Sequence, residues 1–96
     1  MDESFVDKNK LIQLCRENNI TKIGIFGSVA RGDATEKSDI DLLVQFSENK
    51  SLLTHIRLER ELSQLLKRKV DLLTEEAISP YLRDIIKSDL QVLYEA

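Results

Sequence analysis

Two aspartates one residue apart, Asp39 and Asp41, are the residues of this sequence best placed to do chemistry. They lie at the start of a largely apolar segment, residues 39–46, that is typical of a buried strand. Successive side chains of a strand point to opposite faces, so both carboxylates are expected on one face, with their Cα atoms about 6–7 Å apart. At an effective dielectric constant of about 20 the two charges repel by roughly 2–3 kcal/mol. We therefore expect cations to offset this repulsion, and Asp39→Asn to raise the melting temperature of the metal-free protein.

Asp71 is a third aspartate inside an apolar segment, residues 69–74, that is also typical of a strand. If this strand lies beside the first one, the three carboxylates converge at the surface of the sheet. Hard oxygen ligands suit Mg²⁺ or Mn²⁺, which leave positions for water and phosphate. Two such ions about 3.5–4 Å apart hold the attacking and leaving oxygens of a phosphoryl displacement. The spacing predicts that Asp39 and Asp41 bridge a metal pair and that Asp71 completes the ligands of the metal that activates the incoming hydroxyl.

A turn of small residues, Gly27-Ser28, precedes the paired aspartates. Glycine lets the backbone approach a ligand closely, and Ser28 offers an N–H and a hydroxyl. Arg31 follows within one helical turn and is suited to hold a phosphate oxygen in a charge-assisted contact. A plain turn and a solvent-facing strand are the simpler interpretations of each motif alone. Their joint occurrence with Asp71 favours a phosphate-binding metal site.

The whole chain limits the classes of protein that fit. Ninety-six residues predict a single domain, residues 1–96, and the net charge of −3 argues against a general nucleic-acid-binding surface. No apolar run approaches the ~20 residues of a membrane span, and the acidic N-terminus is not that of a signal peptide. Cys15, the single cysteine, is expected to be a small buried apolar residue. These features predict a cytoplasmic protein without membrane contact.

Hydrophobic periodicity predicts helices and strands along the whole chain. The predicted helices span residues 7–18, 51–68 and 80–87, and the predicted strands span residues 21–26, 39–46, 69–74 and 90–94. Residues 29–31 fit one helical turn and residues 34–38 a polar loop, while Ser79 and Pro80 fit a helix start. This order predicts an α/β (α+β) fold, a small mixed sheet with helices packed on it.

Two helices carry more specific expectations. In the helix predicted over 51–68, the buried stripe is expected to comprise Leu52, Ile56, Leu58, Leu62, Leu65 and Leu66. His55 of the same helix is expected to be exposed. The last helix is predicted to present an apolar surface to a partner or a second copy, formed by Tyr81, Leu82, Ile85 and Ile86.

The combined signature resembles that of the DNA polymerase beta-like nucleotidyltransferase superfamily. It consists of Gly27-Ser28-Val29-Ala30-Arg31-Gly32 and Ser38-Asp39-Ile40-Asp41-Leu42-Leu43-Val44, with Asp71 as the distal carboxylate. Within the superfamily the chain is similar to the minimal nucleotidyltransferases, or MNT proteins, which are often partnered with HEPN toxins. Asp33 stands where such proteins often carry glutamate, a departure that leaves the metal ligands unchanged.

The resemblance implies the polymerase beta-like nucleotidyltransferase fold, ATP as substrate, and two Mg²⁺ ions, with Mn²⁺ as a substitute. The implied site residues are Gly27, Ser28, Arg31 and Ser38 for the nucleotide, and Asp39, Asp41 and Asp71 as catalytic metal ligands. It also implies transfer of AMP to a tyrosine of a HEPN-type toxin, so that the chain acts as an antitoxin. The expected assembly is a hetero-complex with the toxin, and a homo-oligomer is the alternative.

Two other functions stay open. The chain could be an antitoxin that neutralises its toxin by binding alone. It could instead transfer a nucleotide to a small hydroxylated molecule such as an aminoglycoside, as larger relatives with an extra helical domain do. The three intact aspartates favour protein AMP transfer.

Overall fold

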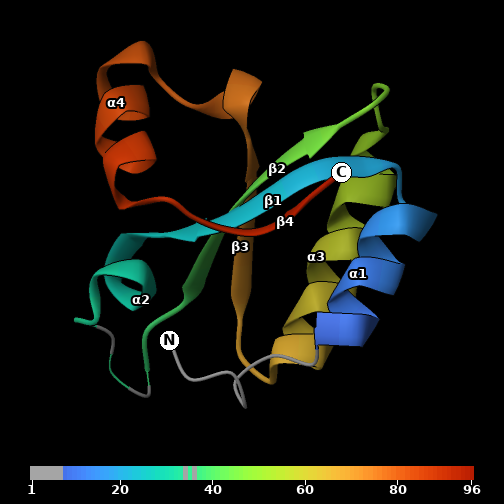
Figure 1. Cartoon of the computed structure of the whole chain (residues 1–96), viewed down its shortest axis with the longest axis horizontal. Coiled ribbons are helices and arrows are strands. Elements are labelled where there is room, and N and C mark those ends of the chain that lie inside the picture. Colours follow the sequence, from blue (N-terminus) through green and yellow to red (C-terminus); the bar gives the residue numbers. More distant parts are fainter. Residues whose placement is uncertain (1–7, 34, 36) are drawn as a thin grey trace.

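A computed structural model describes residues 8–33, 35 and 37–96, and within them a mixed four-stranded sheet has the order β3-β2-β1-β4 (Figure 1). The strands are β1 Ile20–Phe26, β2 Ile40–Phe46, β3 Val70–Thr74 and β4 Gln91–Glu95. The helices are α1 Lys8–Glu17, α2 Gly27–Arg31, α3 Leu52–Leu66 and α4 Pro80–Asp89, with a short 3₁₀ turn η2 Glu75–Ala77. The predicted fold class is confirmed. The expected helix start at Asp7, the N-terminal segment and residues 34 and 36 of the loop lie outside the described residues.

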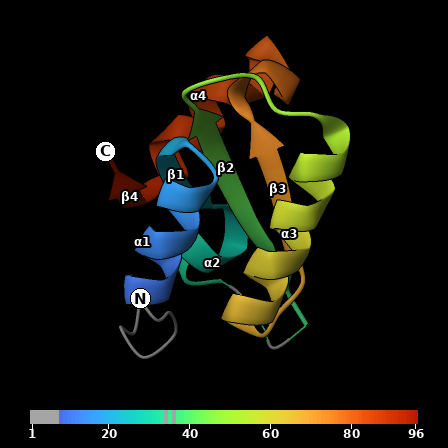
Figure 2. The ribbon, with the colours of Figure 1, turned by 90° about the vertical axis from the view of Figure 1, so that its right-hand side faces the viewer.

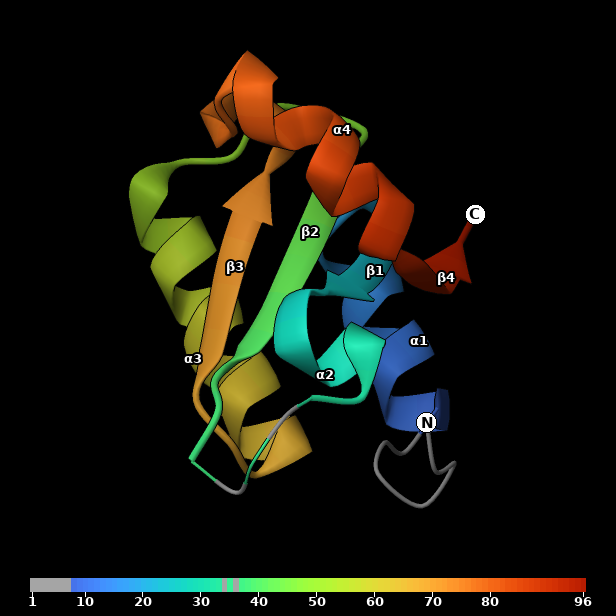
Figure 3. The same ribbon diagram turned by 90° about the vertical axis from the view of Figure 1, so that its left-hand side faces the viewer.

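Helices cover both faces of the sheet. Figure 2 shows α1 and α3 together on one face, and Figure 3 shows α2 and α4 on the other. On β2, Leu42 is buried in the cluster with α1 and α3, whereas Leu43 is buried with Phe26 in the cluster beneath α4. Asp41 lies two residues before Leu43, so the strand alternation places its carboxylate on the α2 and α4 face.

Strand pairing brings the predicted site residues to one end of the sheet. β2 and β3 run parallel, with Asp41 and Asp71 as register partners. β1 pairs antiparallel with β2, and its last residue, Phe26, is the register partner of Asp41. The condition for convergence of the aspartates, that β3 lies beside β2, is therefore confirmed. Gly27 follows Phe26 directly and reaches the same end of the sheet.

β3 is an edge strand, and its outer backbone groups need partners. Side chains of α3 supply them. The carboxylate of Glu59 accepts from the Leu72 N–H at 2.8 Å, and the hydroxyl of Ser63 accepts from the Val70 N–H at 3.0 Å. The His55 Nε2–H donates to the Leu72 carbonyl at 2.7 Å. α3 thus protects this edge from pairing with another strand.

The buried face of α3 differs from the predicted stripe in its first turns. Leu58 and the leucines one and two turns after it are buried, but Leu52 is 73% exposed and Ile56 is 45% exposed. At about 100° per residue, Ile56 lies roughly 200° from Leu58, on the other side of the helix. Position 55, three residues before Leu58, is on the buried side. The expectation that His55 is exposed is therefore wrong, because its half-buried ring faces β3.

Replacing Glu59 with alanine is expected to lower the free energy of unfolding by about 1–3 kcal/mol, because the buried Leu72 N–H loses its acceptor. For a domain of this size that corresponds to a fall in melting temperature of roughly 4–8 °C per kcal/mol, which thermal denaturation measures. Glu61→Ala is the matched control, since Glu61 lies on the same helix and faces α1. An equal loss in both variants would contradict the edge-strand role of Glu59.

α4 begins as the sequence predicts. Ser79 is its N-cap, with a hydroxyl that accepts from the Tyr81 N–H, and Pro80 is its first residue. The predicted apolar surface is exposed at three of its four positions, Tyr81, Leu82 and Ile85. Ile86 is instead half-buried and packs against the cluster beneath α4. No helix of the described part of the chain is long and apolar enough to span a membrane.

Candidate active site

Two of the three predicted carboxylates lie side by side on neighbouring strands. Asp41 and Asp71 are register partners, and both are half-buried. Asp39 precedes β2 by one residue instead of opening the strand, and its carboxylate lies 3.7 Å from the Lys69 ammonium. Burial, and then the charges of Asp71 and Asp39, raise the pKa of Asp41, which the Arg31 charge opposes. The charges of Asp39 and Asp71 therefore both act on Asp41.

The chemistry of this donor set fits a hard divalent cation. Among the residues that the structure describes, no three His, Cys, Asp or Glu side chains are gathered closely enough to hold a metal ion by themselves. The predicted convergence of all three carboxylates on one point is therefore not found. Asp41 and Asp71 nevertheless lie side by side at one end of the sheet, and oxygen is the ligand that Mg²⁺ and Mn²⁺ prefer. An ion bound by this set would take further oxygens from water and phosphate. The donor set thus suits an ion that is shared with a triphosphate.

Gly27, the first residue of the Gly27-Ser28 turn, lies against the carboxylate of Asp41. It has a φ of +77°, in the left-handed region that favours glycine. A Cβ at this position would clash with Oδ2 of Asp41 and lie 3.3 Å from its Cγ. The expected close approach of the backbone is therefore present, and the group approached in this structure is the Asp41 carboxylate.

Ser28 and Arg31 lie on α2, directly after this glycine. The Ser28 carbonyl accepts from the Asp33 N–H at 2.9 Å, which closes the helix. The Arg31 guanidinium donates from Nη1 to Asp89 at 2.9 Å and from Nε to Asp33 at 3.2 Å. Hydrogen bonds to Asp89 and Asp33 raise the pKa of Arg31 and so favour its positively charged form. The sequence predicted Arg31 as a phosphate ligand but missed Asp89, which lies 58 residues away.

Ser38 closes the turn that leads to Asp39. Its hydroxyl accepts from the Thr35 N–H at 2.9 Å. The Arg68 guanidinium donates to the carbonyls of Thr35 and Ser38 and so ties this turn to the end of α3. Ser38 thus helps to place Asp39, and its role as a nucleotide ligand stays a prediction.

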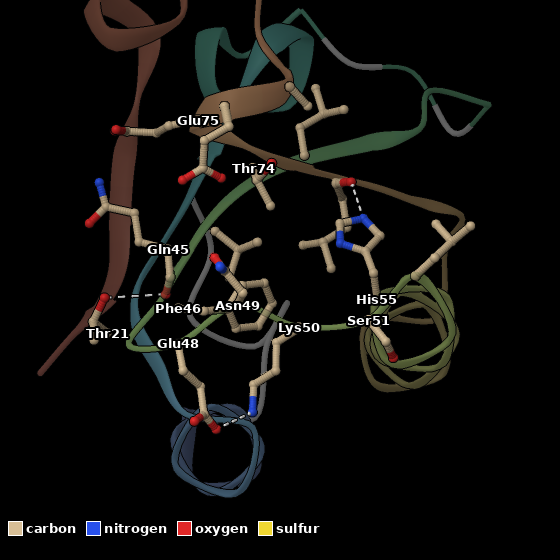
Figure 4. Close-up of a pocket in the computed structure, with 16 residues that line it drawn as sticks. Thr21, Gln45, Phe46, Glu48, Asn49, Lys50, Ser51, His55, Thr74 and Glu75 are labelled. Atoms are coloured by element: carbon tan, nitrogen blue, oxygen red, sulfur yellow. Dashed lines mark hydrogen bonds and ion pairs between the residues drawn. The ribbon is translucent and has the colours of Figure 1, made fainter.

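A well-formed cavity among the described residues is remote from the aspartates. It measures about 750 Å³ and lies at the far end of β2, between the end of β3 and the start of α3 (Figure 4). None of the predicted site residues lines it. Lys50 and Glu48, two of its charged side chains, pair with each other at 3.0 Å. The candidate active site is therefore located by its carboxylates and not by cavity size.

Register-paired aspartates at the end of a small mixed sheet, beside a glycine turn, are the arrangement that the sequence predicts for nucleotidyl transfer. The chain belongs to the nucleotidyltransferase domain family, whose sequence profile matches residues 8–93. The predicted family and the predicted class of enzyme, a nucleotidyltransferase, are confirmed.

Named relatives and solved structures agree with this assignment. The chain is 48% identical over 76 residues to the protein adenylyltransferase MntA of Thermococcus cleftensis, covering 79% of this chain and 76% of the relative. It is similar to a chain of a toxin–antitoxin crystal structure with AMP-PNP, with a TM-score of 0.79, 27% identity, and coverage of 95% of this chain and 75% of that one. It is also similar to a chain from a tri-AMPylated Shewanella oneidensis HEPN toxin in complex with an MNT antitoxin, with a TM-score of 0.69, 25% identity, and coverage of 93% and 70%.

Proposed function

We propose that this chain transfers AMP from ATP to a tyrosine hydroxyl of a HEPN-type toxin and thereby acts as its antitoxin. The observation that carries this proposal is the meeting of Asp41 and Asp71 on neighbouring strands, with Gly27 packed against Asp41. Two relatives support it, since one is named a protein adenylyltransferase and the other is a chain from the complex of a tri-AMPylated HEPN toxin with an MNT antitoxin. The proposal places the reaction in the cytoplasm, in a hetero-complex with the toxin.

The proposed reaction is an in-line displacement at the α-phosphorus of ATP. The acceptor hydroxyl oxygen forms a bond to this phosphorus, the bond between the α- and β-phosphates breaks, and pyrophosphate leaves. Asp71 accepts the hydroxyl proton. Asp39, Asp41 and Asp71 would hold two Mg²⁺ ions, which when bound would neutralise charge on the triphosphate and lower the pKa of the acceptor hydroxyl.

The triphosphate is proposed to lie against α2. Gly27 leaves room for it beside the backbone, and Ser28 offers its N–H and hydroxyl. Arg31 supplies a positive charge that acts on Asp41 and therefore reaches the same region. These groups hold and orient the nucleotide, while the aspartates act at the reacting phosphate.

Mixing the protein with ATP, Mg²⁺ and its HEPN-type partner is expected to add the mass of AMP to the partner. Intact-mass spectrometry measures the adduct, and phenylalanine in place of the acceptor tyrosine is expected to remove it. Chelation of Mg²⁺ by EDTA is the control for metal dependence. A stable complex that shows no adduct with ATP and Mg²⁺ present would contradict transfer to the toxin.

Neutralisation by binding alone is the second candidate function. It is favoured by one observation, the exposed apolar side of α4 formed by Tyr81, Leu82 and Ile85. Such a surface on a small protein suits contact with another protein. The complex without an adduct is the outcome that supports this candidate.

A further inference from the structure

Asp89 is an acidic residue in an unfavourable place. It is the last residue of α4, where the partial negative charge of the helix end disfavours a carboxylate. The side chain is only 21% exposed, and its Oδ2 lies 2.9 Å from Nη1 of Arg31 on α2. The ion pair with Arg31 offsets the unfavourable helix position.

The segment that carries Asp89 is held against the sheet and against α2. Leu90 packs on β1 at Gly24, where a Cβ would lie 2.6 Å from Leu90 Cδ1 and 3.1 Å from the Gln91 carbonyl oxygen. The Gln91 side chain donates to the Ala30 carbonyl of α2 at 2.9 Å. Figure 3 shows α4 and α2 on the same face of the sheet. Asp89 is therefore attached to a backbone whose position relative to α2 is set by packing and a hydrogen bond.

The two carboxylates that bind Arg31 use different nitrogens. Asp89 accepts from Nη1 and Asp33 accepts from Nε. Within the described residues these two contacts leave Nη2 for another acceptor. Arg31 is the last residue of α2, and the first residue of this short helix, Gly27, lies against the Asp41 carboxylate, so Arg31 borders the candidate active site. Asp33 is 66% exposed and only two residues from Arg31 in the sequence. Its ion pair with Arg31 is therefore the weaker of the two.

We propose that Asp89 is a positioning residue, which holds the Arg31 guanidinium so that Nη2 meets a phosphate oxygen of the nucleotide. This inference rests on the proposed function, in which ATP lies against α2. Asp89 acts through Arg31 and touches neither ATP nor the acceptor. Its loss therefore affects the binding of the nucleotide more than the chemical step.

Replacing Asp89 with asparagine is expected to weaken Mg²⁺–AMP-PNP binding by about 5–20-fold, because the hydrogen bond that orients Arg31 loses the negative charge of its acceptor. Calorimetric titration measures the Kd, and thermal denaturation checks that the variant is folded. In AMP transfer, KM for ATP is expected to rise by a similar factor and kcat to change by less than about 2-fold. Asp84→Asn, the same substitution at an exposed position of α4, is the matched control and is expected to bind like the wild type.

A double-mutant cycle separates positioning from a structural role. In the Arg31→Ala background, Asp89→Asn is expected to have no further effect on AMP-PNP binding, because the residue through which Asp89 acts is gone. A further loss in that background would overturn the proposal, and so would tighter binding by Asp89→Asn, which would mean that Asp89 sequesters Arg31. Wild-type protein that binds no AMP-PNP would overturn the proposed function as well. Wild-type binding that Asp89→Asn leaves unchanged would overturn only the role of Asp89.

Discussion

Asp41→Asn is expected to reduce AMP transfer by about three orders of magnitude or more. Asp41 lies between Asp71, its register partner, and Gly27, so its carboxylate is central to the site. Asparagine has nearly the same shape but lacks the negative charge that makes a carboxylate a strong ligand for a divalent cation. Initial rates from intact-mass spectrometry measure the loss, and Asp84→Asn on α4 is the control that keeps the same change in net charge. Transfer within about 10-fold of the wild type would contradict a metal-binding role for Asp41.

The same variant is expected to be more stable than the wild type at neutral pH without metal. Burial and the charges of Asp71 and Asp39 raise the pKa of Asp41 in the folded state, so its ionised form destabilises the fold. Because Asp41 is partly exposed, solvent screens these charges and the gain in melting temperature is expected to be small.

The pH dependence of this gain has a definite sign. A carboxyl whose pKa is raised on folding binds its proton more tightly in the folded state, so stability falls as pH rises from the ordinary carboxyl pKa through the raised one. The advantage of Asp41→Asn is therefore expected to be full at neutral pH and to vanish below the ordinary pKa. Melting temperatures across this range test it. A gain that persists in acid would show that like charge is not its cause.

The sequence predicts that Asp39→Asn relieves the like-charge repulsion, whereas in the structure Asp41 is the member of the pair whose pKa is raised. Asp39→Asn was the expected stabilising change, because alternation along one strand treats both aspartates alike. In the structure Asp39 precedes β2 and pairs with Lys69 at 3.7 Å, so its charge already has a partner. The position of Lys69 depends on how β3 enters the sheet, which strand periodicity does not determine. Asp39→Asn also removes a charge that repels Asp41 but loses the pair with Lys69, so we expect a smaller gain from it than from Asp41→Asn.

The convergence of Asp41 and Asp71 could be predicted because it needs only local information and one assumption. Each aspartate interrupts an apolar strand, and alternation determines which face it takes. The assumption is that the two strands are neighbours, and the parallel register of β2 and β3 confirms it. The glycine of the turn could be predicted for the same reason, since it follows a strand that ends at the same place.

Contacts between distant segments could not be predicted in this way. Arg31 and Asp89 are 58 residues apart, and they meet because Leu90 packs on Gly24 of β1. The hydrogen bond from Leu72 to Glu59 depends on which strand lies at the edge of the sheet. Charged residues on helices are usually solvated, so their sequence pattern does not single out the few that bind a backbone group or position an arginine.

Gly27→Ala is expected to lower the free energy of unfolding by about 2–4 kcal/mol and to abolish AMP transfer. Two costs add at this position. The residue has a φ of +77°, and its new Cβ would clash with Oδ2 of Asp41. Relief requires movement of the carboxylate or of the turn, and either movement disrupts the proposed site. Thermal denaturation and intact-mass rates measure the two effects.

Gly32→Ala separates these two costs. Gly32 has a similar φ of +82°, but a Cβ there meets no atom within 4 Å among the described residues. It should therefore cost only the backbone strain, about 1 kcal/mol, and leave most of the activity. In an Asp41→Ala background the carboxylate is gone, so the difference in stability between the two alanine variants is expected to disappear. If the difference in stability survives in that background, the clash of the new Cβ at position 27 is not with Asp41. That result would contradict the proposed contact between the glycine turn and this carboxylate.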